Sequence, residues 1–193
     1  EETIKKLDRM PRQVLIEVTD PFVYQEALDL MELHRSEGRD IYIVSSSPEE
    51  VVRPLAQHFG VAGVLATRAR IEDGRYTGEL EFYCYGEGKA EAIRSLAQDR
   101  GIDLGSSYAY SDSATDLPML WTVGHPVAVN PDKELRKEAE AKGWDIRDFR
   151  RPVRLRTRIV QTAAHPRTRV AAGLVAATAA AAIVLWLVVR SRL

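Results

Sequence analysis

The chain of 193 residues contains a single cysteine, Cys84, and almost no net charge. One cysteine cannot form an intramolecular disulfide, so we expect an apolar core to hold the fold and the thiol to be inert. A net charge of −1 gives no overall preference for nucleic acid. The four histidines are too scattered to predict a metal site and are expected at helix surfaces or turns. The complete loop G-x-x-x-x-G-K-[ST] of nucleotide-binding proteins is also absent.

Charge is missing altogether from residues 170–189, a run of twenty residues rich in Ala and Val. As a helix rising about 1.5 Å per residue, it would span about 30 Å, the thickness of the hydrocarbon core. We therefore expect a transmembrane helix there, with a short tail over 190–193. Eight arginines from Arg147 to Arg169 precede it and two follow, which predicts a cytoplasmic folded domain. Residues 150–169 are expected to form an arginine-rich juxtamembrane linker, solvated or lying on anionic headgroups.

Apolar strands alternate with helical patterns through the middle of the chain. Residues 41–44, 108–110 and 127–129 are short apolar runs, each followed by the start of a helix. This alternation predicts an α/β fold with a Rossmann-like parallel sheet and helices on both faces. Because ligands bind beyond the carboxyl ends of the strands in such sheets, the residues after these runs are the candidate functional residues.

Turn and cap residues predict the element boundaries. Asp73-Gly74 lies between two alternating segments and predicts a hairpin. Asp20-Pro21 and Asn130-Pro131 are expected to open helices as cap and first turn. Ser47-Pro-Glu-Glu50 resembles a capping box.

Five residues at the expected carboxyl edge suit phosphate chemistry. The Ser45 hydroxyl and the backbone around Ser46 could hold phosphate oxygens at a helix N-terminus. Lys89, at the start of a helix, could offset phosphate charge. Asp112 and Asp116 follow a strand and offer the oxygen ligands that Mg²⁺ prefers. Phosphoryl transfer depends mainly on such positioning and charge stabilisation.

These segments resemble the haloacid dehalogenase superfamily, and more closely its phosphoserine-phosphatase-like subfamily IB hydrolases. The resemblance covers about residues 20–149. It is carried by Ile41-Tyr-Ile-Val-Ser-Ser-Ser-Pro48, Gly86-Glu-Gly-Lys89-Ala, Tyr110-Ser-Asp-Ser-Ala-Thr-Asp-Leu-Pro-Met-Leu120, Leu65-Ala-Thr67, Asp73-Gly-Arg-Tyr-Thr-Gly78 and Val123-Gly-His-Pro-Val-Ala-Val-Asn-Pro-Asp132.

The resemblance implies a role for each candidate. Ser45 would bind phosphate, Lys89 would stabilise nucleophile and phosphate, Asp112 would be a Mg²⁺ ligand, and Asp116 would support the metal or its waters. Phosphoserine phosphatases usually have Gly-Asn before the second acid, whereas this chain has Ala114-Thr115. That departure puts the asparagine contact to phosphate, and phosphoserine as substrate, in doubt.

The first motif of the family, Asp-x-Asp-x-Thr, does not occur in the 193 residues. That motif would supply the nucleophile, which forms an aspartyl-phosphate. The strand before it would lie in the centre of the sheet, between the strands that end at Val44 and Tyr110. We therefore expect a fragment of a longer protein that is inactive alone, with 1–38 as the end of a helical cap and 39–149 as the core.

The expected function is a membrane-anchored, Mg²⁺-dependent phosphatase of small phosphorylated substrates, with lipid-related compounds among the candidates. The alternative is a membrane-tethered binding or scaffold protein without catalysis. Nucleic acid is not expected as a partner. The identity of the substrate and the oligomeric state are left open. Tyr83 and Tyr85, beside the Gly-rich segment, are equally compatible with substrate contact and with core packing.

Overall fold

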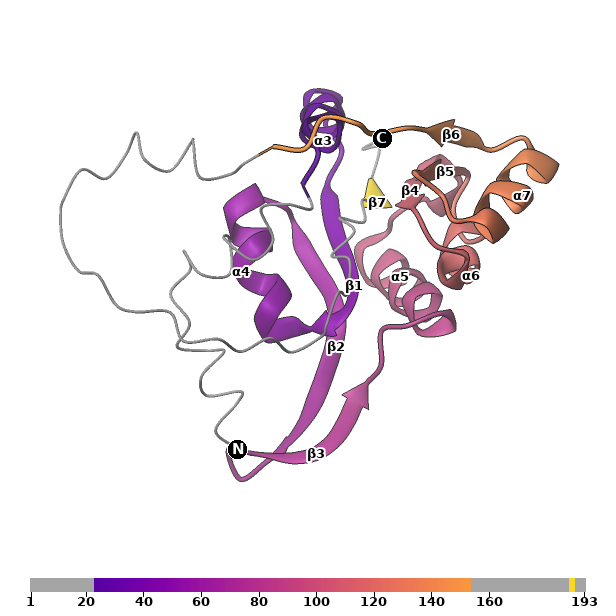
Figure 1. Ribbon diagram of the computed structural model, residues 1–193. Coiled ribbons are helices and arrows are strands. Elements are labelled where there is room, and N and C mark those ends of the chain that lie inside the picture. Colours follow the sequence, from indigo (N-terminus) through magenta and orange to yellow (C-terminus); the bar gives the residue numbers. More distant parts are fainter. Residues whose placement is uncertain (1–22, 154–187, 190–193) are drawn as a thin grey trace, which may run out of the picture.

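The computed structural model describes residues 23–153 and the two-residue strand 188–189 (Figure 1). In chain order the elements are α3 (Gln25–Ser36), β1 (Ile41–Pro48), α4 (Glu49–Phe59), β2 (Gly63–Glu72), β3 (Arg75–Phe82), α5 (Glu87–Arg100), η2 (Leu104–Ser106), β4 (Tyr108–Ser111), η3 (Ala114–Asp116), α6 (Leu117–Leu120), β5 (His125–Val129), α7 (Lys133–Lys142), β6 (Asp145–Arg147) and β7 (Val188–Val189).

The strands form one sheet in the order β3-β2-β1-β7-β4-β5-β6. Two groups of parallel strands, β1 with β2 and β4 with β5 and β6, lie on either side of β7. The backbone of β7 pairs antiparallel with both β1 and β4. The predicted α/β architecture is therefore confirmed. Among the described residues, only β7 lies where a central parallel strand was expected.

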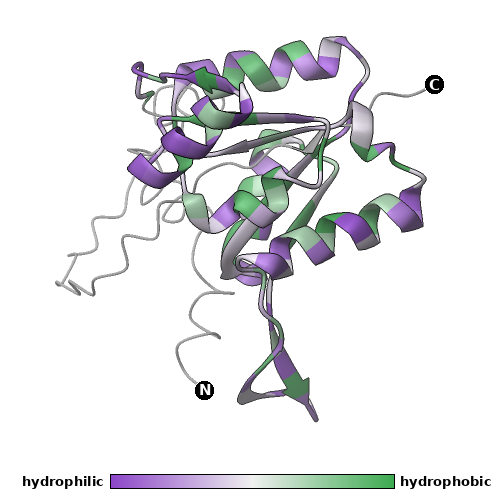
Figure 2. Ribbon diagram, turned by 90° about the vertical axis from the view of Figure 1, so that its right-hand side faces the viewer, coloured by the Kyte–Doolittle hydropathy of each residue, from purple (hydrophilic) through white to green (hydrophobic). Residues whose placement is uncertain are grey.

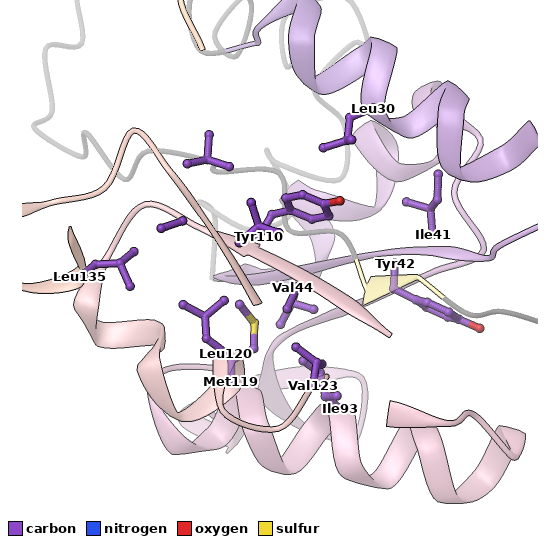
Figure 3. Close-up of a cluster of buried hydrophobic side chains, with 14 of the residues drawn as sticks. Leu30, Ile41, Tyr42, Val44, Ile93, Tyr110, Met119, Leu120, Val123 and Leu135 are labelled. Carbon is purple, nitrogen blue, oxygen red and sulfur yellow. The ribbon is translucent and has the colours of Figure 1, made fainter. Parts of the chain in front are cut away.

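Strand β1 is buried on both faces, as its uninterrupted apolar run predicts. Its Ile43 packs with Val52 and Ala56 of α4 in one cluster. Val44, the next residue, belongs to the larger cluster on the opposite face, which also contains Ile93 of α5 (Figure 3). Because successive side chains point to opposite faces of a strand, one short segment anchors two helices.

The helices that cover the sheet are amphipathic, and the β2–β3 hairpin extends away from the body (Figure 2). The predicted turn is confirmed, with positive φ at both Asp73 (50°) and Gly74 (73°). Two consecutive residues of positive φ are the mark of the tight turns that match the twist of a hairpin.

Helix α3 crosses the sheet and buries His34 against β4. The His34 side chain is 2% exposed, so its expected place on a helix surface was wrong. Its Nε2 lies 2.6 Å from the Tyr110 hydroxyl, and Arg39 Nη1 lies 3.0 Å from its Nδ1. Because arginine only donates hydrogen bonds, Nδ1 is the acceptor and the ring is neutral, with its proton on Nε2.

Several predicted helix starts differ from the structure. Strand β1 continues to Pro48, and α4 begins at Glu49 without a side-chain cap, so the capping box at Ser47 was wrong. Helix α7 is capped by Asp132, whose carboxylate accepts from the Leu135 N–H at 2.8 Å, rather than by Asn130. The predicted cap at Asp20 lies outside the described residues, and α3 begins at Gln25.

The predicted transmembrane helix over 170–189 requires correction. No helix within residues 23–153 is long and apolar enough to cross a membrane. The last two residues of the predicted span, Val188 and Val189, pair as a strand in the sheet instead of continuing a helix. Hydropathy alone misled the prediction, because an apolar run fits a buried strand as well as a bilayer. Residues 170–187, most of the predicted linker, and the tail 190–193 lie outside the described residues, and the predicted cytoplasmic placement is not tested.

Candidate active site

The candidate residues lie at the carboxyl edge of the sheet, where β1 and β4 end. Ser45 and Ser46 are near the end of β1, while Asp112 directly follows β4. Lys89 lies in the first turn of α5, and Asp116 ends the short helix η3. The fold thus places two loops and one helix start, far apart in sequence, at the edge where ligands bind in such sheets.

Lys89 and Asp116 form a buried ion pair. The Lys89 Nζ lies 2.7 Å from Asp116 Oδ1, with the two side chains 6% and 2% exposed. The other carboxylate oxygen, Oδ2, accepts a hydrogen bond from the Ser111 hydroxyl at 3.2 Å. Both oxygens of Asp116 are therefore engaged, and its carboxylate holds the Lys89 ammonium in place.

Asp112 has a different environment from Asp116. Burial, assisted by the negative charges of Asp116 and Asp132, raises the pKa of its carboxyl group to about 6, against the opposing effects of a backbone hydrogen bond and of Lys89. Among the described residues its side chain forms no ion pair. A carboxylate whose charge is disfavoured in this way gains from a nearby cation.

Asp132 braces the loop that carries both acids. One of its carboxylate oxygens accepts from the Ala114 N–H at 2.8 Å, while its own N–H donates to the Asp112 carbonyl at 2.8 Å. Asp132 was recognised in the sequence only as part of the family resemblance. The signal that could have revealed its role is its place as the last polar residue before the α7 pattern, which is typical of an N-cap.

Ser45 is 6% exposed, and its hydroxyl accepts from the Ser47 N–H at 3.2 Å. The adjacent Ser46 carbonyl accepts from the Thr67 hydroxyl at 2.7 Å. These contacts fix the backbone at the end of β1. They also explain the longer strand, because the Ser47 N–H bonds back to Ser45 and does not begin a helix.

The site has two halves, one with Ser45 at the end of β1 and one with Lys89 and Asp116, and Cys84 interacts electrostatically with both. Burial raises the pKa of its thiol to about 11, whereas the charge of Lys89 and a hydrogen bond from the Ser45 backbone oppose the rise, and Asp116 adds to it. The thiol is thus close to residues of both halves. Its raised pKa keeps it protonated near neutral pH, in agreement with the expected inert thiol.

The structure brings Lys89 and Asp116 into contact. Asp112 lies just past the end of β4, and Ser45 lies near the end of β1 at the same edge of the sheet. No group of three or more His, Cys, Asp or Glu side chains suited to a metal ion occurs within the described ranges 23–153 and 188–189. The Asp112 carboxylate is therefore the group that could bind a cation directly. Asp116 already has partners for both of its oxygens.

A cavity of about 650 Å³ lies away from these residues. It is lined by side chains that include Tyr108, Trp121, His125 and Trp144. Tyr108 and His125 begin β4 and β5, so the cavity lies toward the amino ends of the strands. None of the five candidate residues lines it.

A family model described as haloacid dehalogenase-like hydrolase matches residues 1–120. A Streptomyces azureus protein named for inhibition of morphological differentiation is 49% identical over 191 residues, which is 98% of this chain and 69% of that protein. A probable phosphatase of Mycobacterium tuberculosis is 51% identical over 171 residues, 89% of this chain and 60% of that protein. The chain thus spans only about two thirds of the length of these relatives.

Two further relatives carry specific enzyme names. A phosphoserine phosphatase of Mycobacterium tuberculosis is 37% identical over 77% of this chain and 48% of its own length. A histidinol-phosphatase of Neisseria meningitidis is 35% identical over 76% of this chain and 68% of its own length.

Solved structures share the fold. A Bordetella pertussis protein of unknown function has a TM-score of 0.59 at 36% identity, covering 63% of this chain and 56% of that one. A phosphoserine phosphatase in its apo form has a TM-score of 0.55 at 20% identity, covering 84% and 85%.

Proposed function

The chain belongs to the haloacid dehalogenase-like hydrolases, with relatives named as phosphatases, and from this premise we propose that the complete protein is a Mg²⁺-dependent phosphatase of small phosphomonoesters. The observation that carries the proposal is the buried Lys89–Asp116 pair beside Asp112. A buried ion pair is weak as a device for stability, because desolvation opposes the attraction between the charges. At the ligand-binding edge of the sheet the pair has a functional value, because it fixes the positive charge of Lys89 where a phosphate can bind.

In this proposal Lys89 binds a phosphate oxygen and is held in position by Asp116. Its ammonium is pre-positioned and desolvated, so its attraction for the charge of a phosphoryl group is stronger than in water. The Ser45 hydroxyl and the fixed backbone of Ser46 complete the phosphate pocket from the β1 side. These roles agree with those that the family resemblance implied for the same residues.

The residues fit a Mg²⁺ ion. The Asp112 carboxylate would hold it directly, since its oxygen is the ligand type that Mg²⁺ prefers and its charge is disfavoured without a cation. Asp116 would act behind it, because Lys89 and Ser111 occupy its two oxygens. When bound, the ion would offset charge on the phosphoryl oxygens. Asp132 keeps the loop between the two acids in position.

The proposed substrates are small phosphorylated metabolites. Two relatives are named for phosphoserine and histidinol phosphate, which share a phosphate ester on a small, amine-bearing alcohol. This support applies to the class of substrate and not to either compound.

Turnover also requires a nucleophile, and the Asp-x-Asp-x-Thr motif is absent from the 193 residues. We therefore propose that this chain alone is inactive. Phosphate release by the purified 193-residue chain, dependent on Mg²⁺, would contradict that part of the proposal.

The test uses the full-length protein that contains this chain. We expect phosphate release from phosphoserine, histidinol phosphate or another small phosphomonoester, lost on chelation and restored by Mg²⁺. Lys89→Met is expected to abolish it, whereas Lys142→Met, in α7, leaves it unchanged. Mg²⁺-dependent binding of inorganic phosphate without any hydrolysis would instead indicate the non-catalytic binding protein.

A further inference from the structure

Tyr83 and Tyr85 form an exposed stacked pair. Their ring centroids lie 5.4 Å apart, with an angle of 12° between the ring planes. The side chains are 54% and 45% exposed. Core packing, one of the two interpretations open from the sequence, is thus wrong for both. Two large aromatic side chains held face to face in solvent call for an explanation beyond the hydrophobic effect.

The backbone between the two rings is rigid. Cys84 is fully buried, and its N–H donates to the Thr67 hydroxyl at 3.2 Å. The Tyr85 N–H donates to the Tyr83 carbonyl at 3.0 Å, which closes a tight three-residue turn. A side chain at Gly88 would lie 2.2 Å from that same carbonyl. The loop is thus closed from both sides, and little backbone freedom remains to be lost when a ligand contacts the rings.

This rigid loop lies at the proposed active site. Thr67, which binds the Cys84 N–H, also donates to the Ser46 carbonyl. Gly86 packs against the loop between the two acids, since a Cβ there would lie 3.8 Å from the Thr115 carbonyl oxygen. Lys89 follows in the first turn of α5. The tyrosines therefore stand at the rim of the site, one residue on each side of the buried Cys84.

We propose that Tyr83 and Tyr85 form an aromatic platform on which a planar ring in the leaving group of the substrate stacks. This inference rests on the proposed phosphatase function. Parallel rings offer a flat outer face, which a second ring can cover in an offset stack and a saturated ring cannot. A platform of this kind binds rings without requiring a particular pattern of hydrogen bonds.

The two acids that adjoin the platform add little attraction for a cationic group. Glu81 pairs with Arg68 at 3.7 Å, and Glu87 pairs with Arg94 at 2.7 Å. The acids adjoining the loop are thus already neutralised by arginines. An ammonium group would find the faces of the rings but no uncompensated carboxylate from these two acids to add to the attraction.

The experiment compares two esters with alkyl leaving groups of similar size, 2-phenylethyl phosphate and 2-cyclohexylethyl phosphate. With the full-length protein and Mg²⁺, kcat/KM is measured for wild type and for Tyr85→Leu, Tyr83→Leu and Tyr85→Phe. We expect each leucine variant to lose about 5- to 10-fold for the phenyl ester, mainly through KM, because stacking binds ground and transition states alike. The cyclohexyl ester is expected to change less than about twofold, and Tyr85→Phe to resemble wild type.

The matched control is Trp121→Leu, which removes an equally exposed aromatic side chain (57%) that lines the distant cavity. It is expected to change neither ester. Equal losses for both esters in the leucine variants would overturn the platform and show that the tyrosines only support the loop.

If the wild-type protein hydrolyses neither ester, the proposed phosphatase function has failed, and this result is distinct from a failure of the platform. The platform is then tested by the equilibrium binding of the two esters to wild type and to Tyr85→Leu. The platform is supported if wild type binds the phenyl ester more tightly than the cyclohexyl ester and Tyr85→Leu does not. Equal binding of both esters by wild type contradicts it.

Discussion

The Lys89 ammonium lies 2.7 Å from Asp116 Oδ1 although both side chains are almost wholly buried. Lys89→Met is expected to destabilise the protein by about 3–5 kcal/mol, because it leaves the Asp116 charge buried without a partner. The double variant Lys89→Met/Asp116→Leu should regain most of that loss, since two apolar side chains leave no charge to desolvate. Urea unfolding of the two single variants and the double variant measures the coupling.

The matched control is Arg94→Met, which breaks the exposed pair with Glu87 at the same 2.7 Å separation. Its expected cost is below about 1 kcal/mol. Simple additivity of the two buried substitutions would show that Lys89 and Asp116 are not coupled.

Asp112→Asn is expected to separate activity from stability. The buried carboxylate, with its pKa raised to about 6, is disfavoured in the folded protein without a cation. Its removal should leave the free energy of unfolding unchanged or raise it, while Mg²⁺-dependent turnover of the full-length protein falls at least about a hundredfold. Phosphate release and unfolding are measured on the same samples.

Asp103→Asn provides the comparison for Asp112→Asn. Asp103 is a carboxylate in an exposed turn that accepts from the Gly105 N–H at 2.9 Å. Full activity of Asp112→Asn together with lowered stability would reverse the roles assigned to this acid.

The buried His34 ring predicts a pH dependence of stability. Burial, with smaller contributions from the positive charges of Arg39 and Arg147, lowers its pKa from 6.5 to about 4. The unfolded chain therefore binds more protons between these values, so stability is complete above pH 6.5. It falls as the pH drops toward 4, by up to about 3 kcal/mol.

Urea unfolding between pH 4 and 7.5 tests this dependence. His34→Gln is expected to flatten the curve over that range. His125→Gln, at an exposed position that stacks on Tyr108, should leave the curve unchanged. An unaltered slope in His34→Gln would assign the dependence to the carboxylates.

Gly88→Ala tests the closed loop beside Lys89. The added Cβ would lie 2.2 Å from the Tyr83 carbonyl oxygen, a backbone atom that cannot turn aside. We expect a loss of stability of about 1–3 kcal/mol as the loop shifts. Gly105→Ala is the control, because its nearest contact is the flexible Asp103 side chain at 3.2 Å. Equal stability of the two variants would contradict a rigid loop.

The parts of the fold that could be predicted depend on local signals. The apolar run at Ile41–Val44 and the Asp73-Gly74 turn each allow few alternatives, and both elements are present. Ser45 and Asp112 were predicted at one edge because parallel strands bring their carboxyl ends together, and Lys89 was expected to point there from a helix start. Asp116 was expected beside Asp112 in the segment after β4. The direct contact of Lys89 with Asp116 was not predicted, since it depends on how α5 packs against the region of α6 that follows Asp116.

The errors arose where a local sequence pattern is compatible with more than one structure. Ser47 has the sequence of a cap, yet its N–H bonds to Ser45 and the strand continues. Asp132, and not Asn130, caps α7 because its carboxylate also meets the Ala114 N–H, a contact across eighteen residues. The apolar run ending at Val189 was read from hydropathy alone, which does not distinguish a membrane span from a buried strand.

The Thr67 hydroxyl joins the end of β1 to the loop between β3 and α5, since it donates to the Ser46 carbonyl and accepts from the Cys84 N–H. A ligand that shifts the Ser46 backbone therefore also shifts the loop that carries the two tyrosines. Because both segments are already held in place, occupancy that fixes the binding geometry of one favours the binding geometry of the other and increases affinity there. Thermodynamic reciprocity makes this effect equal in both directions. A single hydroxyl thus links recognition of the phosphate to recognition of the group that leaves it.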